Sequence, residues 1–340
     1  MPAAAFARRY ASLCRALGAG AGVLVLAACG GGGSGGGGPV AAPVASEPVA
    51  SEPVASEPAA SAPALGEIPA MSDTSRLSFP LDAYDPSPAD QRLLERAQDR
   101  LAVRCMARYG FEYVPPKRSG GPERPVNSRV FGVVDAEEAA RYGYRDPGAA
   151  SADRPRDPEL SAEGRLTLYG ERVAPAEMPM SQEEAEREGG SERKVGGKSV
   201  PVGGCNRESY LKLYAPKADA VDIMFVFNLK ARAKAQGDAD ARLRRNNEEW
   251  AACMKKAGYR ATDPMAVVRQ LGFEGALDSP AAVAAAKADV ACKKKVNLVG
   301  VRYTVLAAYQ QRLVDQHAAT LELAVQQQED RLEQAADLVG

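Results

Sequence analysis

The sequence predicts a mainly α-helical domain that is crosslinked by two disulfides, ends in a long C-terminal helix and follows a disordered tether rich in glycine and proline. Three observations support this fold class. Only 6% of the 340 residues are aromatic, and much of the 45% apolar fraction is alanine, which favours helix. The motif C-M-x3-G-[F/Y] occurs twice, so we expect two helical copies. Four cysteines follow the tether, an even number that is typical of disulfides in an exported chain.

The first 28 residues have the features of an export signal. Three arginines precede an apolar run that ends in the sequence LAAC at residues 26–29. This ending resembles the lipobox of bacterial lipoproteins, which implies cleavage between Ala28 and Cys29 and a diacylglycerol on the Cys29 thiol. We therefore expect a lipid anchor on the outer face of the cell membrane. The alternatives are a secretory signal with a chance cysteine and an uncleaved anchor, for which the run is short.

Residues 29–84 are predicted to be a disordered tether. Residues 30–38 are glycine with one serine, and the sequence VASEP then occurs three times between residues 44 and 58. A proline at every fifth position blocks helix formation, and the Ala, Ser and Glu between the prolines cannot form a core. Proline-rich chain extends by about 3.1 Å per residue. We therefore expect this segment to hold the folded domain well away from the membrane.

Four cysteines remain beyond the signal and the lipid site, and they allow three pairings. They are Cys105, Cys205, Cys253 and Cys292. No C-x-x-C spacing is present, so neither a redox-active pair nor a zinc knuckle is indicated. The repeated motif begins at Cys105 in one copy and at Cys253 in the other. The repeat therefore favours bonds within copies, Cys105–Cys205 and Cys253–Cys292.

The repeated motif has a structural explanation as the end of a helix. Gly110 and Gly258 fit the position just after a helix, where the backbone becomes left-handed. In a Schellman cap, the residue three positions inside the helix packs against the residue after the glycine. The residues with this spacing are Met106 with Phe111 and Met254 with Tyr259. We predict that these side chains close two helix ends and do not form a ligand site.

The first copy is predicted to span residues 85–216. Ser87 followed by Pro88 is the N-cap and first residue of a helix that carries Cys105 on its buried face. Residues 145–201 are rich in Pro, Gly, Arg and Glu, and we interpret them as an irregular insertion inside this copy. The proposed Cys105–Cys205 bond would close that insertion.

The second copy and its connecting helix are predicted to span residues 217–300. The connecting helix covers about residues 218–235, and we expect its apolar run at 223–227 to be buried. Ser279 starts a further helix, and residues 301–340 form the C-terminal helix. The last residues have a thin apolar stripe that could dock on the protein's own domain, the favoured interpretation, or on another chain.

The remaining polar features indicate no catalytic, metal or cofactor site. A single histidine, His317, excludes zinc sites that are built on several histidines, and we expect it to be solvated. The sequence GKS at 197–199 lacks the first glycine of a phosphate-binding loop. The acidic run at 183–188 and the lysines at 293–295 are expected to be exposed faces. With 43 basic and 44 acidic residues, the chain offers nothing that favours a nucleic-acid partner.

The combination of motifs resembles a family of uncharacterised secreted lipoproteins from actinobacteria. Besides the two C-M-x3-G-[F/Y] motifs, the resemblance depends on Trp250, FGV at 131–133, AARYGY at 139–144, GGC at 203–205 and ADVACKKK at 288–295. It covers about residues 85–315. The resemblance implies no activity, but it agrees with a lipid anchor and with disulfides.

Three hypotheses for the function follow. The first is a non-enzymatic binding or interaction module of the cell envelope, whose partner is wall polymer or an envelope protein. The second is a carrier of a small ligand in a pocket between the two copies, with Trp250, Phe225, Phe227 and the capping Met and aromatic pairs as candidate walls. The third, an envelope hydrolase that uses carboxylates, has the least support. The sequence leaves the oligomeric state open.

Overall fold

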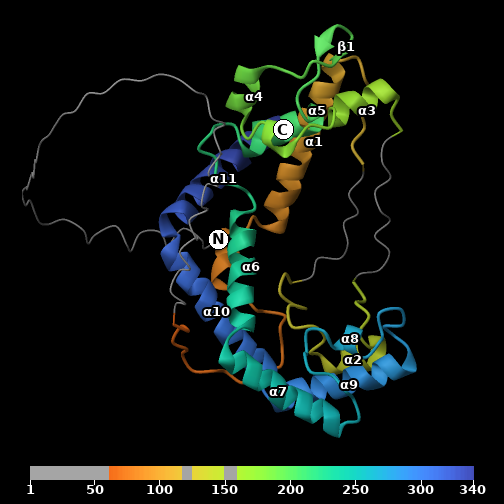
Figure 1. Ribbon diagram of the computed structural model, residues 1–340, viewed down its shortest axis with the longest axis vertical. Helices are drawn as coiled ribbons and strands as arrows, with labels where there is room; N and C mark the ends of the chain where they lie inside the picture. The colour runs from red at the N-terminus through yellow and green to blue at the C-terminus, as the bar shows by residue number, and fades with distance from the viewer. Residues whose placement is uncertain (1–60, 117–124, 149–158) are drawn as a thin grey trace, which may run out of the picture. The chain divides into compact units, whose positions relative to one another are not determined.

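The structure, a computed structural model, describes residues 61–116, 125–148 and 159–340 (Figure 1). Within these ranges the fold is mainly helical, which confirms the predicted fold class. The predicted signal peptide, the lipid site at Cys29 and most of the tether lie outside the described residues. Among the described residues, no helix combines the length and apolarity that a membrane span needs.

Besides the α-helices, the described residues form two short 3-10 helices and one small hairpin. In chain order, the α-helices are α1 (Pro88–Arg108), α2 (Ala136–Tyr142), α3 (Ala162–Tyr169), α4 (Gln182–Glu188), α5 (Gly204–Tyr214), α6 (Phe225–Asp238), α7 (Ala241–Lys256), α8 (Val267–Gln270), α9 (Pro280–Lys295), α10 (Leu298–Gln316) and α11 (Ala318–Val339). The 3-10 helices are η1 (Pro80–Tyr84) and η2 (Pro175–Glu177). The hairpin pairs β1 (Lys194–Val195) antiparallel with β2 (Lys198–Ser199).

Both predicted disulfides are confirmed. Cys105–Cys205 joins the end of α1 to the start of α5, and Cys253–Cys292 joins the last turns of α7 and α9. The second cysteine therefore begins its helix in one copy and lies near the end of its helix in the other. The internal repeat therefore covers the ends of α1 and α7 with their caps. It does not extend to α5 and α9, the helices that carry the second cysteine of each bond.

Both motif copies end in the Schellman turn that their spacing predicts. The two glycines have φ values of +83° and +91°. The N–H of Phe111 donates to the Met106 carbonyl at 3.2 Å, and the N–H of Tyr259 donates to the Met254 carbonyl at 2.9 Å. Both methionines are fully buried, so these caps are part of the core.

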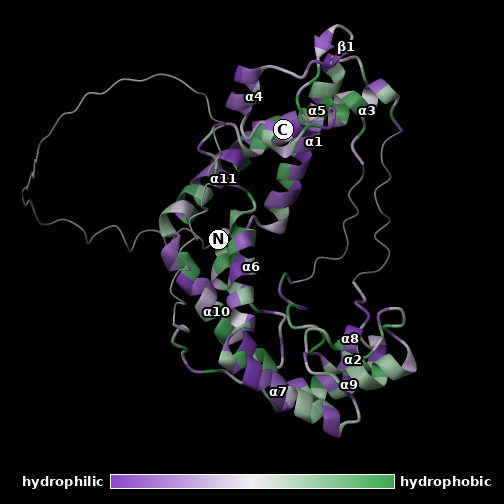
Figure 2. Ribbon diagram, viewed as in Figure 1, coloured by the Kyte–Doolittle hydropathy of each residue, from purple (hydrophilic) through white to green (hydrophobic). Residues whose placement is uncertain are grey.

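Three groups of helices enclose most of the core. Helices α2, α7, α8 and α9 surround Trp250, where Figure 2 shows a mainly hydrophilic α7 beside a mainly hydrophobic α9. Helices α6, α7 and α10 pack with η1 around Leu243 and Leu313. Helices α1, α5 and α11 meet around Leu94 and Leu213.

The predicted C-terminal helix is divided in two. Helices α10 and α11 meet at His317, which has a non-helical φ of −117°. The half-buried imidazole of His317 lies edge-on to Phe225, with the ring centroids 5.6 Å apart. Helix α11 packs along α1 and contacts α5, so the C-terminal segment docks on its own domain.

The predicted boundary of the tether at residue 84 is wrong, because residues 61–84 are packed against the domain. We call this segment the strap. Leu81 of the strap is fully buried. Side chains of α10 and its N-cap satisfy strap carbonyls: Arg312 Nη1 donates to Ser61 at 2.9 Å, and Asn297 Nδ2 donates to Pro69 at 2.9 Å. These partners satisfy backbone carbonyls of the extended part of the strap, which precedes η1.

The predicted insertion at 145–201 is partly ordered, and the predicted connecting helix is shorter than expected. The described part of the insertion, 159–201, contains α3, η2, α4 and the hairpin. Helix α6 begins at Phe225, after a turn in which Asp222 Oδ1 accepts the N–H of Met224 at 2.9 Å. The expectation that the apolar run at 223–227 is buried is wrong, because none of its residues is buried and Phe227 is 60% exposed. The helix buries the face of Leu229, and Phe227, two residues away, points to the opposite side.

The expectation that residues 293–295 form an exposed face is wrong for Lys293, which is only 2% exposed. Its Nζ lies 3.0 Å from Asp289 Oδ2 and donates to the Val133 carbonyl at 2.9 Å. Asp289 Oδ1 accepts from Trp250 Nε1 at 2.9 Å. Burial raises the pKa of Asp289 in spite of the neighbouring Lys293. The i,i+4 spacing on α9 brings this ion pair onto the buried face of the helix.

Replacing Lys293 should destabilise the domain far more than replacing its neighbour. Lys293→Met leaves Asp289 buried without its counter-ion, and we expect the free energy of unfolding to fall by about 3–5 kcal/mol. Lys294→Met, at an exposed position, should change it by less than about 0.5 kcal/mol. Urea unfolding followed by the fluorescence of Trp250, the single tryptophan, measures both. Equal effects of the two substitutions would contradict a buried pair.

The strap depends on a close approach of its backbone to α10. A Cβ atom at Gly300 would lie 2.0 Å from the Pro69 carbonyl oxygen. Gly300→Ala should therefore displace the strap and lower the free energy of unfolding by about 1–3 kcal/mol. Hydrogen exchange of peptides from residues 61–84 should become faster. Gly275→Ala, where a Cβ meets open space, is the control; unchanged exchange in Gly300→Ala would show that the strap is not held there.

Candidate functional site

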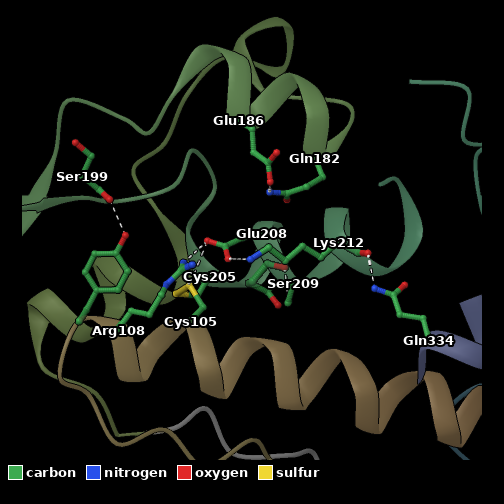
Figure 3. A network of polar contacts seen from close by, with 12 residues as sticks. Cys105, Arg108, Gln182, Glu186, Ser199, Cys205, Glu208, Ser209, Lys212 and Gln334 are labelled. Carbon is green, nitrogen blue, oxygen red and sulfur yellow. Dashed lines mark hydrogen bonds and ion pairs between the residues drawn. A yellow bond between two sulfur atoms is a disulfide. The ribbon is translucent and has the colours of Figure 1, made fainter. Parts of the chain in front are cut away.

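A cavity of about 350 Å³ lies beside the Cys105–Cys205 disulfide. Its walls are formed by the end of α1, by helices α4 and α5, and by the segment that connects α4 to α5. Five charged or amide side chains line it together with Ser199 and the ring of Tyr109. They are Arg108, Gln182, Glu186, Glu208 and Lys212. Figure 3 shows Arg108 beside the disulfide and the side chains of α4 opposite those of α5. We call this cavity the disulfide cavity.

The glycines before Cys205 allow α3 and α5 to approach closely. Gly203 and Gly204 have φ values of +74° and +69°. A Cβ at Gly204 would lie 2.4 Å from the Gly170 nitrogen and 2.5 Å from the Leu168 carbonyl oxygen. Only glycine fits this contact, which explains the GGC sequence physically. The contact fixes the start of α5 and therefore the position of Cys205.

The Schellman turn at the end of α1 positions the next part of the wall. Tyr109 directly follows the helix, and its hydroxyl donates to the Ser199 carbonyl of the hairpin at 2.6 Å. Lys198 Nζ donates to the Arg108 carbonyl at 2.6 Å. Burial raises the pKa of Tyr109, so this phenol stays protonated near neutral pH. The hairpin therefore holds the end of α1 in one orientation.

Glu208 is the charged centre of the disulfide cavity. It is only 11% exposed and forms ion pairs with Arg108 and with Lys212, whose Nζ lies 2.5 Å from Glu208 Oε1. Burial alone would raise the pKa of Glu208, but the hydrogen bonds from Arg108 and Lys212 outweigh it and hold that pKa below its usual range. Glu208 therefore stays ionised at neutral pH. Arg108 Nη2 also lies 3.2 Å from Cys105 Sγ, so the ion pair is tied to the disulfide.

Helix α4 forms the opposite wall of the cavity. Gln182 Nε2 donates to Glu186 Oε1 at 2.7 Å, and both side chains face Glu208 across the cavity in Figure 3. The N–H of Gln182 donates to the Ala215 carbonyl just after α5 at 2.8 Å, which attaches α4 to α5. The wall is therefore fixed relative to Glu208.

The charges that line the cavity balance one another. Two cationic side chains, Arg108 and Lys212, stand beside two carboxylates, Glu208 and Glu186. The lowered pKa of Glu208 suits an ionised carboxylate and not a general acid of glycoside hydrolysis, which needs a raised pKa. Within the described ranges, no group of three or more His, Cys, Asp or Glu side chains is placed to hold a metal ion.

The pocket expected from Trp250, Phe225 and Phe227 does not form as predicted. Trp250 is fully buried and its indole N–H is bonded to Asp289, so it lines no cavity wall with the phenylalanines. It is a core residue of α7, on the face that packs against α9. Phe225 and Phe227 do line a cavity, but with α1 and α11 as its other walls.

Sequence reasoning missed the disulfide cavity, and Glu186 was singled out only as part of an acidic run that was expected to be exposed. The six cap residues of the two motifs lie at helix ends as predicted, and none of them lines this cavity. One local signal was present, because Glu208 and Lys212 have the i,i+4 spacing of a helical ion pair. Comparison of the chain with protein-family models, curated proteins and solved structures finds no match.

The ion pairs of Glu208 should make stability depend on pH. Because the pKa of Glu208 is lowered in the folded state, its contribution is present above the unfolded value of 4.5 and is lost as the pH falls through the folded value. Glu208→Gln should therefore lower the free energy of unfolding by about 1–2 kcal/mol at pH 7. The difference from the parent protein should vanish in acid.

Urea unfolding of the parent protein, Glu208→Gln and Glu186→Gln at several pH values between 3 and 7 tests this. Glu186 is exposed and accepts one hydrogen bond from a side chain, so its substitution should change stability by less than about 0.5 kcal/mol throughout. An effect of Glu208→Gln that is the same at every pH would contradict the assignment.

Proposed function

We propose that the protein is a lipid-anchored, extracytoplasmic binding module of the bacterial cell envelope, and that the disulfide cavity binds a hydroxyl-rich glycan segment of wall polymer. The observation that carries this proposal is the rigid, charge-balanced cavity beside the Cys105–Cys205 bond. The lipid anchor is the expectation from the LAAC sequence at residues 26–29.

The two disulfides support an extracytoplasmic location. Disulfides persist in oxidising compartments and are rare where thiols are kept reduced. Both bonds connect separate helices and involve at least one fully buried cysteine, Cys205 in one and Cys292 in the other. Such bonds are structural crosslinks, as expected for a domain outside the cytoplasm.

The polar groups of the cavity suit hydroxyl groups. A sugar hydroxyl both donates and accepts hydrogen bonds, so it is bound best where donors and acceptors alternate. Arg108 and Lys212 supply donors, Glu208 and Glu186 supply acceptors, and Gln182 supplies both. A strongly charged ligand would face two side chains of its own sign. The cavity therefore favours a neutral, hydroxyl-rich segment.

Co-sedimentation with purified cell-wall sacculi tests the proposal. The oxidised chain from residue 30 to residue 340, which lacks the predicted lipid, should pellet with sacculi. Because the cavity is charge-balanced, pelleting should change little between low and moderate salt. Failure to pellet would overturn wall polymer as the ligand, and pelleting that disappears at moderate salt would indicate non-specific attraction.

A matched pair of variants on α4 assigns the binding to the cavity. Glu186 lines the cavity, and Glu188 lies two residues away on the same helix, is exposed and does not line it. Glu186→Ala should weaken sacculus binding by about tenfold or more, which corresponds to one lost hydrogen bond of a charged acceptor. Glu188→Ala should leave it unchanged. Equal binding by the two variants would place the contact elsewhere.

A further inference from the structure

A second cavity, of about 400 Å³, lies where α1, α6 and α11 meet. We call it the α6 cavity. Its walls are mostly apolar and include Phe225, Val226 and Phe227 of α6 and Leu94 of α1. Cavities of this size take small organic ligands. The α6 cavity is distinct from the disulfide cavity and shares no lining residue with it.

The mouth of the α6 cavity exposes large apolar side chains. Phe227 is 60% exposed and Ile223 is 42% exposed, and both line the cavity. Met224, between them in the chain, is 44% exposed. A cluster of exposed apolar side chains at the edge of a concave surface is typical of a binding site. These residues therefore provide apolar surface that a ligand could cover.

A cationic side chain without an acidic partner lines the same cavity. Arg331 of α11 stacks on the ring of Tyr214, 5.0 Å from its centroid, and its Nε donates to the Leu213 carbonyl at 3.2 Å. No carboxylate of a described residue lies within ion-pair distance, and its Nη1 and Nη2 have no hydrogen-bond partner there. Burial lowers the pKa of Arg331, but a guanidinium remains charged in proteins.

The carboxylates that line the α6 cavity are occupied by other groups. Asp85 forms an ion pair with Lys230 of α6. Asp222 accepts the N–H of Met224 at the start of α6. Neither of them neutralises Arg331. Among the described residues, the half-buried guanidinium therefore lacks a neutralising carboxylate.

The wall around Arg331 is held in place by α11. Gln327, one turn before Arg331, accepts the N–H of Val221 at 2.8 Å and donates to the Asp219 carbonyl at 3.0 Å. These bonds fix the loop between α5 and α6 against α11. The apolar mouth and the cation therefore have fixed relative positions, as a preformed ligand site requires.

We propose that the α6 cavity binds a small amphipathic anion, with its carboxylate or phosphate on Arg331 and its apolar body against Phe225 and Phe227. A guanidinium can bind such a head group through two parallel hydrogen bonds. The anion would supply the missing counter-ion, and its apolar body would cover the exposed side chains at the mouth. The proposal does not depend on the glycan site.

Four probes test the contributions of the charged head group and of the apolar body separately. The oxidised chain of residues 30–340 is titrated with decanoate, decyl phosphate, decyl maltoside and butyrate, each as a monomer, by calorimetry and by thermal shift. At least one of decanoate and decyl phosphate should bind saturably and raise Tm. Decyl maltoside and butyrate, which lack the charge or the apolar body, should not. Binding of decyl maltoside as tight as that of the anions, or no binding by either anion, would overturn the proposal.

Matched variants locate the anion and the apolar body. Arg331→Gln should weaken binding of the anionic probe by about tenfold or more. Arg207→Gln is the control, because Arg207 also stacks on a tyrosine, Tyr210, at 5.0 Å but does not line the α6 cavity. Arg331→Lys keeps the charge without the paired donors and should bind between the two. An unchanged Kd in Arg331→Gln would overturn the assignment.

The exposed phenylalanine provides a variant that is not expected to affect folding. Phe227→Ala should weaken binding of the anionic probe by about fivefold. Met180→Ala, at a 71% exposed apolar residue outside the cavity, should have no effect. Equal Kd values for these two variants would overturn the placement of the apolar body.

Sacculus pelleting of the parent protein should be the same with and without the anionic probe. A failure of one proposal therefore leaves the other testable.

Discussion

The Cys105–Cys205 disulfide is the constraint on which the arrangement of the first site depends. It closes a sequence separation of 100 residues, which in the loop-entropy model contributes about 5 kcal/mol. Its position matters more than its energy, because it holds the last turn of α1 against the first turn of α5. Arg108 lies one turn after Cys105, and Glu208 lies one turn after Cys205. The bond therefore brings the two halves of an ion pair together from distant parts of the chain.

Structural positions and candidate sites differ in how completely their buried charges are neutralised by neighbouring groups. Asp289 and Lys293 are almost fully buried and neutralise one another, with Trp250 and a backbone carbonyl satisfying further hydrogen bonds. Glu208 is nearly buried and has two cationic partners. Arg331 is half-buried and, among the described residues, contacts a tyrosine ring and one backbone carbonyl but no carboxylate. Because a partly buried charge is more stable beside an opposite charge, a bound anion would be stabilised at Arg331.

The sequence predicted what depends on local chemistry. Ser87 and Ser279 cap α1 and α9 as expected, since an N-cap followed by proline needs only neighbouring residues. The disulfide pairing followed from the repeated helix end. Lys293 was misjudged because the run of three lysines was treated as one face, although consecutive residues on a helix point in different directions.

Neither the strap nor the two cavities could be predicted from local sequence chemistry. The strap has the composition of a tether. It is held by the burial of Leu81 and by side chains such as Asn297 and Arg312, which donate to its carbonyls from more than two hundred positions later in the sequence. The walls of each cavity likewise come from helices that are distant in the sequence, and no local pattern shows that they meet.

Helix α5 is the wall that connects the two cavities. Glu208 and Lys212 line the disulfide cavity, and Tyr214, at the end of the same helix, lines the α6 cavity. The disulfide fixes the start of α5, and Arg331 donates to the Leu213 carbonyl at its end. Coupling between two sites requires an element with two arrangements that both ligands bias. Because α5 is attached at both ends in this structure, we expect the two sites to bind their ligands independently.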